Sequence, residues 1–86
     1  MAKNFNKITL LVDELLKIKN RKILENFLLG LLTKQEIEEL PVRIKIVRML
    51  KAGIPQKEIA KKLGVGIATV TRGSKEVKIG HFINIK

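Results

Sequence analysis

The stretch over residues 56–72 restricts the fold of this 86-residue chain more than any other part of the sequence. It reads Gln-Lys-Glu-Ile-Ala-Lys-Lys-Leu-Gly-Val-Gly-Ile-Ala-Thr-Val-Thr-Arg. Ile59 and Leu63 have the spacing of the buried face of a short helix, and Ala60 is small enough for a second helix to cross there. Gly64 supplies a left-handed turn, which residues with a Cβ resist. The pattern therefore predicts two short helices joined by a sharp turn, a helix-turn-helix.

The residues after the turn indicate what such a helix pair could contact. Val65 and Val70 are expected to anchor the second helix from below. This leaves an outward face of small or short side chains: Gly66, Ile67, Ala68, Thr69 and Thr71. A helix with such a face can enter the major groove of DNA, and Gln56 and Lys57 can meet phosphates or base edges beside it. An ordinary helical hairpin would explain the apolar residues but not this outward face.

The positive charge lies mostly in the second half of the chain. The whole sequence has 18 lysines and arginines against 8 acidic residues, a formal charge of +10. Residues 1–40 hold seven basic and six acidic side chains, whereas residues 41–86 hold eleven and two. A segment this one-sided repels itself unless it faces a polyanion, and nucleic acid is the first candidate because neutralising phosphates releases bound counterions. The alternative is a solvated lysine-rich surface.

Hydrophobic spacing predicts helices, and no segment reads convincingly as a strand. Apolar residues recur every three or four positions over residues 8–18 and 23–32, and Asn20 can cap the second of these helices. Two apolar faces of this size cannot both be buried within so short a chain. Residues 1–40 are therefore expected to be dimerisation helices, because sharing them between two copies would bury both faces.

The middle of the chain contains predicted helix boundaries. Thr33 and Glu36 form a capping box, and the helix they begin is expected to end before Pro41, which has no N–H to donate. A further helix is expected from Val42, with these residues on or near its apolar face: Ile44, Val47, Met49 and Leu50. The expected fold is a single all-α domain over residues 1–86, with about six short helices and a short tail over residues 79–86.

The composition excludes several classes of protein. The chain has no cysteine, which rules out disulfides, cysteine-ligated zinc and thiol catalysis and fits a reducing compartment. His81 is the only histidine, and a lone histidine makes neither a metal site nor a catalytic triad. The apolar runs are too short to cross a bilayer, and the N-terminal residues contain no apolar signal core. We expect a soluble, cytoplasmic protein without a metal, a membrane partner or enzyme activity.

The sequence resembles the bacterial tryptophan (Trp) repressor family over about residues 23–78. The most specific part is Gly-Ile-Ala-Thr-Val-Thr-Arg-Gly-Ser at residues 66–74, and further matches lie at Leu31, Leu32, Thr33, Glu36, Leu50 and Gly53. The resemblance implies an intertwined, all-helical homodimer that binds double-stranded operator DNA. It also implies that L-tryptophan acts as corepressor by filling a pocket beneath each recognition helix. The expected function is that of a transcriptional repressor controlled by L-tryptophan.

The functional residues follow from the helix-turn-helix and from this resemblance. The supporting helix is expected over residues 56–63 and the recognition helix over residues 67–72. Contacts to DNA are expected from Gln56, Lys57, Lys61, Gly66, Ile67, Ala68, Thr69, Thr71 and Arg72. Residues 42–74 would hold the ligand pocket together with the helix-turn-helix. The resemblance implies that L-tryptophan contacts Leu32, Thr33, Arg43, Arg72, Gly73 and Glu76.

The resemblance also implies a role for each pocket residue. Arg43 and Arg72 match two arginines of the family that flank the indole. A planar guanidinium can stack on an aromatic face, which explains this arrangement. Arg72 could in addition pair with the ligand carboxylate, near which Thr33 lies. Leu32 matches an apolar wall contributed by the partner subunit, and Gly73 lets the ligand approach the backbone. Simpler roles stay open, since Arg43 could contact a phosphate and Thr33 could only cap a helix.

Three features depart from the pattern of the family. Glu76 stands where the family has a serine near the ligand ammonium, and its carboxylate could pair with that ammonium or turn toward Arg72. The connection from Gly53 to Gln56 is one residue shorter, and the family's final helix is absent or vestigial after Lys78. Two alternatives stay open as a result: a related DNA-binding regulator that does not respond to tryptophan, and an interaction module for protein or RNA.

Overall fold

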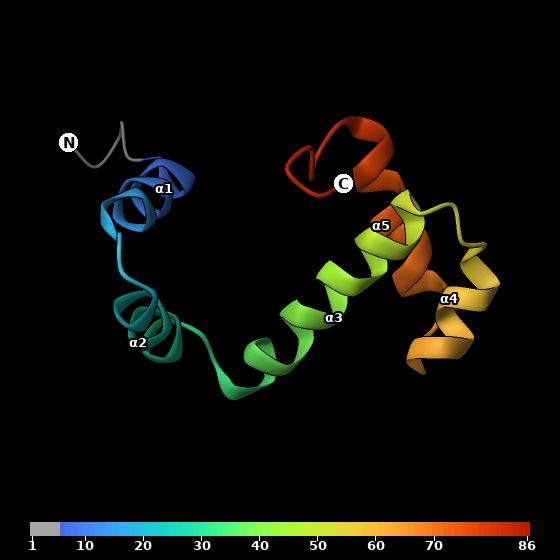
Figure 1. Ribbon diagram of the computed structural model, residues 1–86, viewed down its shortest axis with the longest axis horizontal. Helices are drawn as coiled ribbons and strands as arrows, with labels where there is room; N and C mark the ends of the chain where they lie inside the picture. Colours follow the sequence, from blue (N-terminus) through green and yellow to red (C-terminus); the bar gives the residue numbers. More distant parts are fainter. Residues whose placement is uncertain (1–5) are drawn as a thin grey trace. The chain divides into compact units, whose positions relative to one another are not determined.

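The computed structural model describes residues 6–86, and this part of the chain contains five α-helices and no strand (Figure 1). The helices are α1 (Lys7–Lys17), α2 (Arg21–Leu31), α3 (Lys34–Lys51), α4 (Gln56–Leu63) and α5 (Ile67–Ile79). The prediction of an all-α fold is confirmed. The chain divides into two compact units, one ending at Lys34 and the other beginning at Gln35. Residues 1–5, to which the expectation of no signal core applies, lie outside the described residues.

The first unit consists of α1 and α2, each of which begins at an asparagine. The side-chain oxygen of Asn6 accepts from the N–H of Ile8 at 3.1 Å, and that of Asn20 accepts from the N–H of Ile23 at 3.2 Å. The predicted cap at Asn20 is therefore confirmed. No residue of α1 or α2 is fully buried, and Leu16 leaves 73% of its surface exposed. The apolar faces that the spacing predicted are thus uncovered in a single chain.

The prediction that Pro41 ends a helix is wrong, because α3 runs from Lys34 to Lys51 with Pro41 inside it. This is why the described chain has five helices instead of about six. Proline in a helix interior typically costs about 3 kcal/mol through one lost hydrogen bond and a steric clash. Pro41 is exposed, and the turns after it are held by the buried side chains of Ile46 and Val47. Ile44, predicted on the apolar face, is 42% exposed instead.

The core of the second unit joins its three helices. Ile46 from α3, Ile59 from α4 and Val70 from α5 are almost completely buried and pack together. Partly buried apolar residues surround them: Val42, Met49, Leu50, Ile54, Ala60, Leu63 and Val65. The predicted core roles of Ile59 and Val70 are confirmed. Since α3 contributes to the same core, the helix pair α4 and α5 is held by a third helix.

The turn between α4 and α5 forms as the sequence predicts. Gly64 ends α4 with φ of 67°, in the left-handed region that favours glycine. The N–H of Val65 then donates to the carbonyl of Ala60 at 3.0 Å, which closes the turn. α5 begins at Ile67 but continues well beyond Arg72, where the recognition helix was predicted to end, and stops at Ile79. Gly80 follows it, with φ of 113°.

Candidate DNA-binding surface and ligand pocket

The first turn of α5 presents small, exposed residues to the outside of the second unit. Gly66, Ile67, Ala68 and Thr69 are all exposed, and Ile67 leaves 48% of its surface uncovered. This matches the outward face predicted for them, while Val70, the next residue of the helix, is completely buried. A helix end with this profile can approach the floor of a major groove without a bulky side chain intervening.

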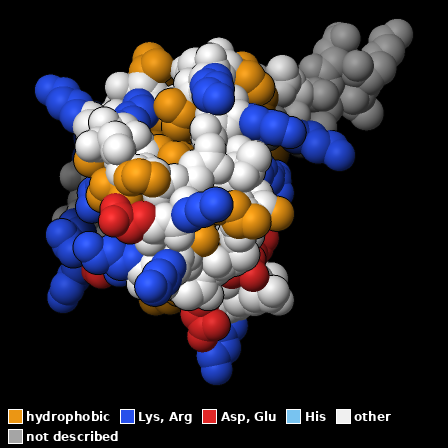
Figure 2. Space-filling model, turned by 90° about the vertical axis from the view of Figure 1, so that its right-hand side faces the viewer, with side chains coloured by type: hydrophobic (Ala, Val, Ile, Leu, Met, Phe, Trp, Pro, Cys, Tyr) orange, Lys and Arg blue, Asp and Glu red, His pale blue; other side chains and the backbone are white. Residues whose placement is uncertain are grey.

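Basic side chains flank this surface. Lys57 and Lys61 on α4 and Arg72 on α5 are exposed, as expected for contacts to phosphate. Figure 2, which views the molecule from the side of α4 in Figure 1, shows several lysine and arginine side chains projecting from that side of the molecule. The carboxylates in residues 41–86 are those of Glu58 and Glu76. The electrostatic field of this half of the chain therefore favours a polyanion.

Thr71 was predicted on the outward face and Gln56 as a contact to phosphates or base edges, but both residues are half-buried. The hydroxyl of Thr71 donates to the side-chain oxygen of Gln56 at 2.8 Å. This hydrogen bond joins the start of α4 to the second turn of α5. Thr71 is therefore less open than Gly66, Ala68 and Thr69, and its contact with DNA stays a prediction.

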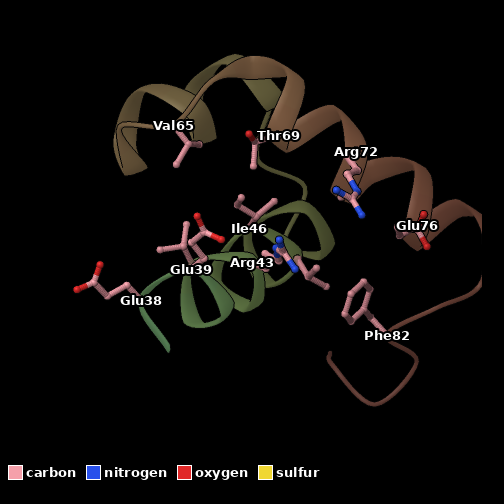
Figure 3. A pocket seen from close by; sticks show the side chains of 12 residues that line it. Glu38, Glu39, Arg43, Ile46, Val65, Thr69, Arg72, Glu76 and Phe82 are labelled. Atoms are coloured by element: carbon pink, nitrogen blue, oxygen red, sulfur yellow. The ribbon is translucent and has the colours of Figure 1, made fainter. Parts of the chain in front are cut away.

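A pocket of about 620 Å³ lies between α3, α5 and the segment that follows α5 (Figure 3). This volume is within the usual range for small-molecule sites. Its lining consists of Glu38, Glu39, Val42, Arg43, Ile46, Val47, Val65, Thr69, Arg72, Gly73, Glu76 and Phe82. Four of the residues predicted to contact a ligand are among them: Arg43, Arg72, Gly73 and Glu76. Leu32 and Thr33 belong to the unit that ends at Lys34 and do not line it.

Charges of both signs surround an apolar floor in this pocket. Arg43 and Arg72 bring guanidinium groups from α3 and α5, and Figure 3 shows both side chains directed into the space between the two helices. Three carboxylates also line it, from Glu38, Glu39 and Glu76. Such an arrangement can hold a zwitterion, with an anionic end at an arginine and a cationic end at a glutamate.

Glu76 has a partner that the sequence did not indicate. Its carboxylate oxygen lies 2.6 Å from Nδ1 of His81, beyond the end of α5. The sequence suggested that the Glu76 carboxylate turns either toward a ligand ammonium or toward Arg72. Neither of these orientations includes the contact with His81. His81 is itself exposed, as expected for a lone histidine.

Gly73 matters for packing as well as for the pocket. A Cβ at this position would lie 3.2 Å from Cγ2 of Ile46 and 3.6 Å from Cδ1 of Leu50. The glycine therefore lets α5 approach α3 closely, and it also lines the pocket. Its contact with a ligand stays a prediction.

Several lining residues were not predicted from the sequence. Ile46 comes from the buried face of α3, and Val47, which was predicted on the apolar face of this helix, was not predicted to line a pocket. Phe82 lies in the segment over residues 79–86, which was predicted only as a short tail. The one feature of the sequence that could have indicated Phe82 is that it is the only aromatic ring of the Phe type after Phe27.

These features define a helix-turn-helix protein. Helices α4 and α5 are joined at a left-handed glycine and pack on a third helix, α3. The pair presents an exposed face of small residues together with exposed lysines. The family described as Trp repressor protein matches residues 6–81. The chain belongs to the Trp repressor family, which is a family of DNA-binding regulators and not of enzymes.

Curated relatives match the chain over roughly half of its length or somewhat more. A Trp operon repressor homolog of Vibrio vulnificus is 52% identical over 50 residues, which cover 57% of this chain and 49% of the relative. A Trp operon repressor homolog of Vibrio cholerae is 49% identical over 55 residues, covering 63% and 53%. A homolog of the same name in Aliivibrio fischeri is 47% identical over 49 residues, covering 56% and 45%. The chain spans about half the length of the curated relatives it matches.

The remaining comparisons add two facts. No solved structure matches the chain significantly. Within residues 6–86, no helix has the length and apolar character needed to span a membrane.

Proposed function

We propose that the chain is a transcriptional repressor that binds double-stranded operator DNA as a homodimer, with L-tryptophan as corepressor. The observation that carries the DNA-binding part is the exposed small-residue turn at the start of α5, flanked by lysines. Membership of the Trp repressor family and relatives named Trp operon repressor homolog support it. A protein with this function acts in the cytoplasm, where bacterial DNA lies.

The DNA contacts divide into two kinds in this proposal. Ile67, Ala68 and Thr69 approach base edges in the major groove, and Gly66 lets the backbone come close. Lys57, Lys61 and Arg72 contact phosphates, which contribute affinity without sequence preference. Gln56 and Thr71 hold α4 against α5 through their mutual hydrogen bond, so that both groups reach the groove together.

The homodimer rests on the uncovered apolar faces of α1 and α2. Ile8, Leu16, Ile23 and Leu29 each expose more than half of their surface, at 61%, 73%, 58% and 65%. Covering a row of such side chains stabilises an association by roughly 25 cal/mol per Å² of apolar surface removed from water. A symmetric dimer also supplies two recognition helices for two half-sites of an operator.

Control by L-tryptophan rests on the pocket between α3 and α5. In this proposal the guanidinium groups of Arg43 and Arg72 flank the indole, and Arg72 also pairs with the carboxylate. Glu76 receives the ammonium, and Gly73 leaves room beside the backbone. Leu32 of the partner subunit supplies an apolar wall, and Thr33 lies near the carboxylate. Because Thr69 and Arg72 line the pocket from α5, a bound ligand would fix the orientation of the recognition helix.

The proposal is tested by selecting bound duplexes from a random DNA library with and without L-tryptophan. We expect an enriched palindromic site, and tighter anisotropy-measured binding to that site when L-tryptophan is present. Equal affinity with and without L-tryptophan would refute the corepressor part alone. Absence of any enriched duplex would refute the DNA-binding part and favour a module for protein or RNA.

A regulator with the same DNA-binding surface and no response to tryptophan is the second candidate. The contact between Glu76 and His81 favours it, because the carboxylate that would receive the ligand ammonium already has a partner. Calorimetry with L-tryptophan separates the two candidates. The chain contains neither Trp nor Tyr, so ligand fluorescence can be followed in the same titration without a protein background.

A further inference from the structure

The segment after α5 folds back on the second unit in a defined conformation. Gly80 ends the helix, and the N–H of His81 donates to the carbonyl of Glu76 at 3.0 Å. Phe82 follows with φ of 62°, in the left-handed region that residues with a Cβ adopt rarely. Such a conformation persists where the surrounding contacts hold it. The segment is therefore fixed by specific interactions.

The principal interaction comes from Lys51 at the end of α3. Its ammonium group is half-buried and donates to two backbone carbonyls, that of Phe82 and that of Ile85, the latter at 2.7 Å. The N–H of Ile85 also donates to the carbonyl of Phe82 at 3.0 Å, which closes a turn around the ammonium. Hydrogen bonds from a charged donor are stronger than neutral ones. Lys51 thus ties the segment to α3.

The consequence of this turn is the position of the Phe82 ring. Phe82 is half-buried and lines the same pocket as Arg43, Arg72 and Glu76. Figure 3 shows the ring directed into the pocket from the segment beyond α5, on the side where the two arginines lie. The pocket keeps about 620 Å³ with the ring in place, so the ring forms a wall and does not fill the space.

We propose that Phe82 is an aromatic wall of the ligand pocket that favours a planar aromatic amino acid, and that Lys51 is its positioning residue. This inference rests on the proposed function of the pocket. An aromatic ligand between the guanidinium groups can meet the Phe82 ring edge to face or offset, a geometry that adds to the burial of apolar surface. An aliphatic amino acid gains burial only.

The test compares L-tryptophan with L-leucine by calorimetry on the full chain. Replacing Phe82→Ala should weaken L-tryptophan binding about three- to tenfold, the effect of removing one aromatic pair. L-leucine binding should change less, so the ratio of the two affinities falls. Phe82→Leu keeps an apolar side chain and should lower the same ratio. Ile83→Ala is the matched control, because Ile83 is the next residue and 85% exposed.

The positioning role of Lys51 has its own readout. Lys51→Met should lower the ratio of L-tryptophan to L-leucine affinity although Phe82 is intact, and Lys51→Arg should restore it because it keeps a charged donor. Thermal unfolding followed by circular dichroism verifies that each variant is folded. A folded Phe82→Ala, Phe82→Leu or Lys51→Met variant that keeps the wild-type ratio contradicts the role assigned to the replaced residue, and so does a folded Lys51→Arg variant that fails to restore it.

The outcomes separate the inference from the proposed function. If L-tryptophan binds the wild type, and binds Phe82→Ala equally well or more tightly, the aromatic wall is refuted and the corepressor proposal stands. Failure of L-tryptophan to bind both the wild type and Phe82→Ala overturns the wall and the corepressor together. Retention of a selected duplex, measured in parallel, then decides whether the DNA-binding part stands.

Discussion

Gly73→Ala is a sharp test of how closely α3 and α5 pack. The substitution adds one methyl group in the interior of α5, where alanine is favoured over glycine by about 0.5–1 kcal/mol of helix stability. The same methyl group would lie 3.2 Å from Cγ2 of Ile46, which is only 2% exposed and has little room to move. Adding a methyl group to a well-packed site costs about 1–3 kcal/mol. The steric cost should outweigh the gain, so we expect the free energy of unfolding to fall by about 1 kcal/mol.

The matched control is Gly30→Ala in α2. A Cβ at Gly30 meets nothing within 4 Å, so the substitution should give the helix gain alone, up to about 1 kcal/mol. Urea unfolding followed by far-UV circular dichroism, at one fixed protein concentration, measures both variants. The two changes should have opposite sign and differ by about 2 kcal/mol. If Gly73→Ala stabilises the protein as much as Gly30→Ala does, the close packing of α5 on α3 is refuted.

Four further substitutions test other parts of the molecule. Lys61→Ala should weaken binding to all duplexes alike, and it should lower the steepness of log affinity against log salt concentration by about 0.9, because one phosphate is no longer neutralised. Thr69→Ala should weaken binding to the selected site only. Equal weakening on all DNA in both variants would contradict this division. Thr71→Val keeps the shape but removes the hydroxyl that donates to Gln56, and should lower the free energy of unfolding by about 1 kcal/mol in urea. Leu16→Glu places a charge on the uncovered face of α1 and should convert a dimer to a monomer in sedimentation velocity; a wild-type chain that already sediments as a monomer contradicts the dimer.

The sequence predicted those parts of the fold that local patterns determine. The spacing of Ile59 and Leu63, the left-handed position of Gly64 and the cap at Asn20 all depend on neighbours along the chain, and each is found as expected. Pro41 was misjudged because a local rule ignores the tertiary packing that holds the turns after it. The expected apolar face of the helix from Val42 included Val47, which is buried, but it also included Ile44, which is 42% exposed, and left out Ile46.

Only part of the candidate pocket was predicted, because the pocket also depends on contacts between residues far apart in the sequence. The resemblance to a family supplied Arg43, Arg72, Gly73 and Glu76, which do line one pocket. Phe82 was out of reach because its position depends on Lys51, which lies 31 residues earlier in the chain. No periodic pattern in the sequence records a hydrogen bond over that separation.

The pocket and the exposed turn of α5 have residues in common, and this ties together two properties that are often assumed to evolve separately. Thr69 and Arg72 line the pocket from the helix whose first turn presents the proposed reading surface. A substitution of Thr69 that retargets the protein to a new operator also alters the cavity behind it. Operator preference and effector preference should therefore be inherited as one trait, and laboratory lineages selected for a new operator should acquire compensating changes in α3.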